Sequence, residues 1–284
     1  LNPFYFYEKE ELTKLADPEK KKYEKIDLPK LLTALASIKG FDKKANVERV
    51  AIADVLRDRM KAKTLSESDI LSIITALLKV FERPVLTLPR NLGVPQGVFD
   101  ALTDAVNQLP PEKFSLITPQ VLQVLTSLTA ETDDITREEG IIWIRGNVIR
   151  IFMLEIINMG IKDYEDRDLL NIGRSLVNTS ENIPWGDKGG AEAYELFLKT
   201  LIKLAERVPS NFAFDFIAAL LDVFTNLPHF ATGRRWPVWD VIREALSQVI
   251  LKLPPQEIQK AQIYIFSRIQ PNAGVPEWMA VIYA

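Results

Sequence analysis

The chain of 284 residues contains no cysteine and only one histidine, His229. The absence of thiols excludes disulfides, iron–sulfur clusters, cysteine zinc sites and a cysteine nucleophile. A lone histidine also limits imidazole chemistry, because a Ser–His–Asp triad needs partners that the sequence does not identify. We therefore predict no metal and no cofactor, and we interpret His229 as a loop residue packed beside Phe230.

A long hydrophobic run is missing as well. The most apolar stretch, from Ile141 to Ile161, is interrupted by charged residues such as Arg145, Arg150 and Glu155. A membrane-spanning helix needs roughly 18 or more consecutive apolar residues. This stretch is therefore predicted to be a buried amphipathic helix, and no membrane span is expected.

The chain has no large excess of one charge, since 35 basic residues face 38 acidic residues and give a formal net charge of −3. This balance disfavours a broad basic surface, so we do not expect a nucleic-acid partner. The absence of disulfides and of a basic and apolar leader favours an intracellular, cytoplasmic protein. Because the first residue is Leu1 and not methionine, we expect this chain to be a fragment of a longer protein.

Apolar residues recur with helical spacing along almost the whole chain. Within Leu28–Ile38 and Ile70–Phe81 they follow the i, i+3, i+4, i+7 pattern, which gives each segment one apolar stripe. Such a stripe must pack against a neighbour. The pattern predicts an all-α fold of about a dozen helices, arranged in antiparallel pairs and joined by short turns.

Helix starts are marked by capping residues and prolines. Ser66 precedes Asp69 by three residues, and Thr136 precedes Glu139 by the same interval, which is the spacing of a capping box. We therefore predict that a long helix occupies about residues 136–160. First-turn positions are predicted for four prolines, since these positions need no backbone donor: Pro29, Pro111, Pro119 and Pro255.

The sequence also contains an internal repeat. The segment Ile73–Phe81 aligns with Phe216–Phe224 at an offset of 143, and Val98–Gln108 aligns with Val238–Gln248 at an offset of 140. Each aligned block keeps its apolar residues in phase. We interpret the chain as one helical-repeat domain, 1–284, whose two related halves are joined by the predicted long helix and span about residues 27–131 and 168–270.

The next block of the repeat begins with the same three residues in both halves. Leu109–Lys113 reads LPPEK and aligns with Leu253–Glu257, which reads LPPQE, at an offset of 144. The extra four residues, Val249–Lys252, are close to one helical turn of about 3.6 residues. An insertion of this length keeps the apolar face in phase.

A duplicated array of short amphipathic helix pairs resembles the HEAT and armadillo-type α-solenoid repeat proteins. The resemblance covers about Asp27–Ile269. It implies a curved surface that binds another macromolecule, and therefore a protein–protein interaction scaffold or adaptor with no catalytic activity. The regular Asp and Arg spacing of the HEAT consensus is absent, so an irregular HEAT-like array and an unrelated helical bundle with a doubled half both fit the pattern.

Two long loops at corresponding positions of the repeat are candidate sites for a protein partner. Arg234, Arg235 and Trp236 follow one another in the second loop, and Arg and Trp are frequent hot-spot residues at interfaces. The first loop contains Arg83 and Arg90. The alternative interpretation places Trp236 in the core and the arginines on a solvated face.

An acidic cluster suggests a second class of function. Asp133, Asp134 and Glu138 resemble the DDxx(D/E) run with which all-helical isoprenoid synthases hold magnesium on a diphosphate. That family also needs a second metal motif on a facing helix, and the nearest segment, with Asn171 and Ser175, lacks the closing Glu. The alternative function is thus a magnesium-dependent helical enzyme acting on a diphosphate.

The acidic cluster also has a simpler explanation. In the sequence it stands at the start of the helix predicted from about Thr136, where negative charge complements the helix dipole. We favour this interpretation over a metal site, and we name no catalytic residue.

Overall fold

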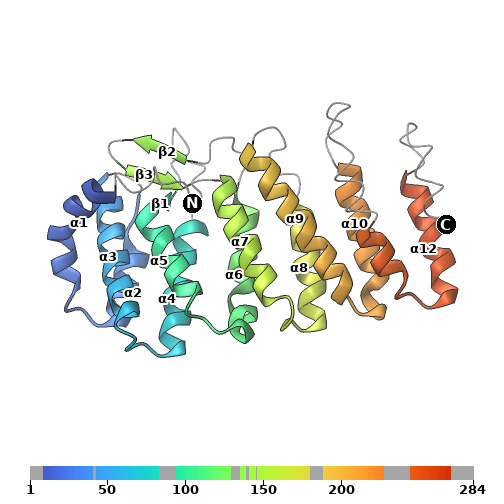
Figure 1. The fold of residues 1–284 in the computed structure, drawn as a ribbon, viewed down its shortest axis with the longest axis horizontal. Coiled ribbons are helices and arrows are strands. Elements are labelled where there is room, and N and C mark those ends of the chain that lie inside the picture. Colours follow the sequence, from blue (N-terminus) through green and yellow to red (C-terminus); the bar gives the residue numbers. More distant parts are fainter. Residues whose placement is uncertain are drawn as a thin grey trace. The chain divides into compact units, whose positions relative to one another are not determined.

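The computed structural model describes residues 9–40, 43–82, 94–128, 135–138, 141–144, 146–179, 188–226 and 244–269 (Figure 1). These residues are almost entirely helical, which confirms the predicted all-α class. The helices are α1 (Lys9–Tyr23), α2 (Leu28–Ser37), α3 (Lys43–Lys61), α4 (Glu67–Glu82), α5 (Gln96–Val106), α6 (Phe114–Ser127), α7 (Gly146–Gly160), α8 (Asp166–Thr179), α9 (Lys188–Arg207), α10 (Ala213–Asn226) and α12 (Pro255–Ile269). Residues 244–250 form a further helix between α10 and α12.

Short 3-10 helices and one small sheet complete the described structure. The 3-10 helices are η3 (Pro111–Lys113) and η5 (Ser210–Phe212), which directly precede α6 and α10. The sheet has the order β1-β3-β2 and is antiparallel throughout. Its strands are β1 (Val94–Pro95), β2 (Ile135–Glu138) and β3 (Ile141–Ile144).

The chain divides into two compact units. Unit 1 comprises Leu1–Asp163 together with Pro184–Ala193, and unit 2 comprises Tyr164–Ile183 together with Tyr194–Ala284. The boundary at Tyr164 lies close to residue 168, where the second half of the repeat was predicted to begin. Whether the units are copies of one ancestral half stays a prediction.

Unit 1 is built as two layers of helices. The odd-numbered helices α1, α3 and α5 pack side by side in chain order (Figure 1). The even-numbered helices α2, α4 and α6 form the second layer, and contacts of α4 with α5 and of α2 with α3 join the two layers. Helix α7 then packs on α6. We call the layer of α1, α3 and α5 the odd layer and the layer of α2, α4 and α6 the even layer.

The local sequence explains why the helices of the even layer begin where they do. Asp27 caps α2, because its carboxylate accepts a hydrogen bond from the Lys30 N–H at 2.9 Å, and Pro29 occupies the first turn. At α4 the predicted capping box is confirmed. Ser66 N donates to Asp69 Oδ2 at 2.9 Å, and Asp69 N donates to Ser66 Oγ at 3.2 Å.

The core of unit 1 follows the apolar stripes that the sequence predicts. Leu31 and Leu35 of α2 are buried, and so are Ile73, Ile74 and Leu77 of α4. Each fully buried aliphatic side chain stabilises the fold by roughly 1.5–3 kcal/mol relative to its exposed state. The periodicity therefore identified the inward faces of both helices.

The predicted long helix is wrong over its first ten residues. Helix α7 begins at Gly146, and Ile135–Glu138 and Ile141–Ile144 instead form an antiparallel hairpin. The run IIWI at Ile141–Ile144 is β-branched and aromatic, a composition that loses side-chain freedom in a helix and fits a pleated strand. The capping box predicted at Thr136 therefore does not exist, because Thr136 lies in β2 opposite Trp143.

One further prediction about helix starts needs correction. Pro29 lies in the first turn of α2, and Pro111 and Pro255 begin η3 and α12, as predicted. Pro119 instead lies inside α6, which begins at Phe114. Since η3 precedes α6 directly, the helix start lies nearer to Pro111 than the sequence suggested.

In unit 2 the helices α8, α10 and α12 pack in chain order, with α10 in contact with both others. Gly173 of α8 allows a close approach, because a Cβ atom at this position would lie 2.4 Å from Phe216 Cε2. The rings of Phe214 and Tyr264 lie 5.3 Å apart and join α10 to α12. Small and aromatic residues thus fit together at these two contacts.

The even-numbered helices begin at regular intervals along the chain. Counting a preceding 3-10 turn with its helix, the intervals between successive starts are 39, 44, 55, 44 and 45 residues. The long interval contains the ten residues of the β2–β3 hairpin, Ile135–Ile144, and without them it would match its neighbours. The starts are Leu28, Glu67, Pro111, Asp166, Ser210 and Pro255.

The two turns with the shared Leu-Pro-Pro sequence also share their backbone hydrogen bonds. In both, one N–H bonds to the carbonyl four residues back and the next two N–H groups bond three residues back. Leu109 and Leu253, which end these patterns, are each only 5% exposed. The offset of 144 therefore relates two turns of the same conformation. The bonds are Asn107–Thr103, Gln108–Ala105 and Leu109–Val106 in one turn, and Leu251–Ser247, Lys252–Val249 and Leu253–Ile250 in the other.

Candidate functional site

The side chains predicted to bind a partner lie outside the described residues, so their role stays a prediction. This holds for both loops of the repeat. It also holds for the single histidine and for two acids of the proposed magnesium site. The residues concerned are Arg83, Arg90, Arg234, Arg235, Trp236, His229, Asp133 and Asp134.

The third acid of that cluster, Glu138, lies on β2 and pairs with Ile141 of β3. The explanation of the cluster by a helix dipole is therefore wrong, because α7 begins only at Gly146. Asn171 and Ser175 both lie on α8. Within the described ranges, no three His, Cys, Asp or Glu side chains come together in a group that could hold a metal ion.

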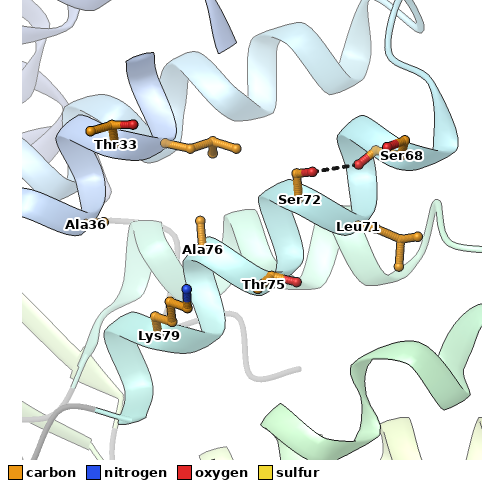
Figure 2. Close-up of a pocket in the computed structure, with 9 residues that line it drawn as sticks. Thr33, Ala36, Ser68, Leu71, Ser72, Thr75, Ala76 and Lys79 are labelled. Carbon is orange, nitrogen blue, oxygen red and sulfur yellow. Dashed lines mark hydrogen bonds between the residues drawn. The ribbon is translucent and has the colours of Figure 1, made fainter. Parts of the chain in front are cut away.

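The described structure instead contains an open groove between α2 and α4, with a volume of about 430 Å³ (Figure 2). Figure 2 shows Thr33 and Ala36 on α2 facing the row of α4 side chains that starts at Ser68 and ends at Lys79. We call this feature the α2/α4 groove. Its lining residues are Leu32, Thr33, Ala36, Ser68, Leu71, Ser72, Thr75, Ala76 and Lys79.

The groove exists because two neighbouring helices of one layer carry small side chains on their outward sides. Most large aliphatic residues of α2 and α4 point into the core, whereas Leu32 and Leu71 line the groove. Ala36 and Ala76 leave space on the outward side, and Ser72 and Thr75 add little bulk. The helices therefore stay in contact below the surface while a hollow remains above the contact.

Two hydroxyl groups of the groove donate their protons to their own helices. Ser72 Oγ donates to the Ser68 carbonyl at 2.8 Å, and Thr33 Oγ1 donates to the Pro29 carbonyl at 2.8 Å. Each hydroxyl oxygen still has lone pairs that can accept a hydrogen bond. The groove therefore offers acceptors and not donors at these two positions.

Lys79 is the one charged residue among the described residues that line the groove. Its side chain is exposed, and no acidic side chain among the described residues lies within ion-pair distance of it. Lys39, three residues after Ala36, is likewise exposed and has no acidic partner in the described part of the chain. The positive charge of Lys79 is thus not neutralised by an acidic side chain among the described residues.

The even layer as a whole carries little charge. Helix α6 contains no charged residue among its 14, and α2 contains only Lys30 among its 10. In the odd layer, by contrast, nine of the 15 residues of α1 and nine of the 19 of α3 are charged. Depletion of charge is the compositional signature of the centre of a protein interface.

The charged residues of the odd layer have a structural role. Arg57 of α3 lies near three aspartates, with its Nε atom 2.7 Å from Asp104 Oδ2 and its Nη1 atom 3.7 Å from Asp100 Oδ2 and 4.0 Å from Asp54 Oδ1. These aspartates hold the pKa of Arg57 above its ordinary value, although burial acts in the opposite direction. This cluster fixes α5 against α3 and leaves no open site.

The sequence contained a signal for the groove that our sequence analysis did not use. Ala36, Ser72 and Ala76 fall on the sides of their helices away from the apolar stripes, where a solvated helix usually carries long charged residues. Small residues at such positions indicate a hollow or a contact. Only the packing of α2 beside α4 shows that the two sets face each other.

None of the helices within the described ranges is long and apolar enough to cross a membrane. Comparison with protein-family models, curated protein sequences and solved structures finds no match to this chain. The function must therefore be argued from the geometry of the chain itself.

Proposed function

We propose that this chain is a protein–protein interaction scaffold built as an irregular α-solenoid of the HEAT or armadillo kind. The observation that carries the proposal is the interval of 44 or 45 residues between the starts of even-numbered helices. HEAT and armadillo repeats are about 40–47 residues long. The one long interval fits the same period once the β2–β3 hairpin is treated as an insertion.

The two-layer packing of unit 1 supports the same proposal. In a repeat protein each helix pair contacts only its neighbours, so odd helices pack on odd helices and even helices on even ones. Helices α1, α3 and α5 follow this rule, and so do α2, α4 and α6. Such stacking leaves one side of each layer free to bind a partner.

Cation-to-carbonyl hydrogen bonds supply what the missing Asp and Arg pattern would provide in a regular HEAT array. Arg49 of α3 donates to the Ile38 and Gly40 carbonyls at 3.2 and 2.6 Å, at the end of α2. Lys252 donates to the Ala205 and Val208 carbonyls at 2.7 and 3.0 Å, at the end of α9. Positive charge stabilises the carbonyl end of a helix.

The scaffold proposal is tested by affinity capture with the tagged chain from an extract of its native cells, followed by binding measurements on the purified partner. We expect saturable binding without turnover. If the Arg and Trp loop is a hot spot, the double change Arg234→Ala and Trp236→Ala weakens binding by about 2 kcal/mol or more. The melting temperature should stay nearly unchanged, whereas a large drop with unchanged affinity would place Trp236 in the core.

A separate activity assay tests the alternative enzyme function. The chain is incubated with magnesium and an isoprenoid diphosphate, and release of inorganic diphosphate is measured. Under the scaffold proposal we expect no release. Magnesium-dependent release that is lost in Asp134→Asn would overturn the scaffold proposal in favour of the enzyme.

A further inference from the structure

We infer that the α2/α4 groove binds an extended peptide segment of a partner protein, with an acidic side chain of that peptide at Lys79. This inference rests on the proposed scaffold function and adds the place of binding and the chemistry of the partner. It is argued without the two Arg-containing loops, because the described residues that line the groove all belong to α2 and α4.

The length of the groove along α4 favours an extended segment over a compact ligand. The hollow is open along its length and is lined by side chains spaced along more than three turns of α4, from Ser68 to Lys79. Its walls carry few large side chains, with only Leu32 and Leu71 contributing aliphatic bulk. A narrow chain with small apolar side chains can lie along such a groove and contact the side chains of both helices.

The hydrogen-bonding pattern favours a peptide backbone. The hydroxyls of Ser72 and Thr33 donate to carbonyls of their own helices and offer acceptor lone pairs to the groove. An extended peptide has unpaired N–H groups that can donate to them. The hydroxyls of Ser68 and Thr75 in the same row can donate as well as accept, so they can also bond to the carbonyl groups of such a peptide.

The positive charge at the end of the groove predicts a negative charge on the peptide. Lys79 is exposed at the end of the row, without an acidic neighbour among the described residues, and Lys39 follows the end of α2 in the same condition. An Asp or Glu of the peptide can pair with this cationic end. The other described lining residues are uncharged, so the remaining peptide side chains should be uncharged and small.

The inference is tested by selecting from a phage-displayed library of random eight-residue peptides on the immobilised chain. We expect enriched sequences in which one Asp or Glu at a fixed position adjoins small apolar residues. Synthetic peptides of the enriched sequences are then measured for binding by fluorescence anisotropy. Peptides without an acidic preference, or no enriched sequences at all, would overturn the inference.

Two groove variants and two matched controls locate the binding. Ala36→Leu fills the groove and Lys79→Glu reverses its charge, and each should weaken peptide binding by about tenfold or more, an effect expected of a central interface residue. Lys21→Glu on α1 makes the same charge change outside the groove, and Ala62→Leu after α3 adds the same bulk at an exposed site. Both controls should bind like the wild type. Equal binding by wild type and Ala36→Leu would overturn the inference.

Binding of a cellular partner to the groove variants distinguishes a wrong binding site from a wrong scaffold function. A partner captured from cells that binds Ala36→Leu and Lys79→Glu as tightly as the wild type would exclude the groove and leave the scaffold function intact. Melting temperatures of all four variants show whether a loss of binding reflects a loss of folding. Ala36 and Lys79 are exposed, so we expect these temperatures to stay close to that of the wild type.

Discussion

The Nε atom of Arg57 donates to Asp104 Oδ2 at 2.7 Å and so links α3 to α5 across 47 positions of the chain. Asp54 and Asp100 also face this guanidinium, and the Arg57 side chain is only 16% exposed. Arg57 therefore faces three carboxylates at a contact between two helices.

Replacing Arg57 with Met should destabilise unit 1 strongly. The change removes the guanidinium that faces three partly buried carboxylates. Breaking a fully buried pair costs about 3–5 kcal/mol, so for this partly exposed cluster we expect a loss of about 2–4 kcal/mol in the free energy of unfolding. Urea denaturation followed by circular dichroism measures the effect. Arg174→Met is the matched control, because the pair of Arg174 with Asp215 is about half-exposed at both partners and should contribute only about 0–1 kcal/mol.

Gly173→Ala should destabilise unit 2 although alanine is the better helix former. The added Cβ would lie 2.4 Å from Phe216 Cε2 and 3.0 Å from Cδ2, and the Phe216 ring is almost completely buried. Overpacking of this kind costs about 1–3 kcal/mol, which exceeds the gain of about 1 kcal/mol in helix propensity. The comparison is Gly97→Ala in α5, whose Cβ would lie 3.1 Å from Val50 Cγ1 and should cost less. Equal melting temperatures for wild type and Gly173→Ala would contradict the prediction.

Lys252→Met should loosen the end of α9. The ammonium group donates to the Ala205 and Val208 carbonyls, which have no further helical turn to bond to them. Loss of these charged hydrogen bonds should cost about 1–2 kcal/mol in the free energy of unfolding. Lys199→Met removes a lysine whose ion pair with Glu195 is exposed, and its effect should be close to zero. A similar loss in both variants would argue against a capping role.

Alkaline pH should weaken the attachment of α1 to α3. Burial, together with a hydrogen bond from its hydroxyl to Glu48, raises the pKa of Tyr23 well above 10.0, and the hydrogen bond to Asp58 raises the pKa of Lys20 above 10.5. Below these ordinary values Tyr23 is neutral and Lys20 is charged in both folded and unfolded chains, so their stabilisation is fully present. Above pH 10 the unfolded chain ionises its tyrosine first, and the lysine contribution is lost as the pH passes the raised pKa.

The prediction is therefore a falling melting temperature between about pH 10 and pH 12. Tyr23→Phe keeps the buried ring and removes the ionisable hydroxyl, so its melting temperature should fall less steeply over this range. Both proteins are measured by circular dichroism in the same buffers, and their difference at neutral pH gives the reference. Parallel curves for the two proteins would show that Tyr23 does not contribute to the alkaline transition.

Several features of the fold could be predicted from the sequence because they depend on neighbours along the chain. Helical periodicity identified the buried faces of α2 and α4, including Leu31 and Ile73, since a helix repeats every 3.6 residues whatever packs against it. The capping box of Ser66 and Asp69 spans three residues and is equally local. The predicted helix at Thr136 failed because hairpin formation depends on pairing between strands, and periodicity alone did not distinguish a helix from the strand IIWI.

Other features were decided only by the tertiary structure. The sequence shows that Ala36 and Ala76 lie away from the apolar stripes, but only the packing of α2 beside α4 places them on the two sides of one groove. In the same way, Asp100 and Asp104 meet Arg57 because α3 and α5 are neighbours in one layer. A periodic pattern specifies which face of a helix is buried, whereas the identity of its neighbour depends on how all the helices pack together.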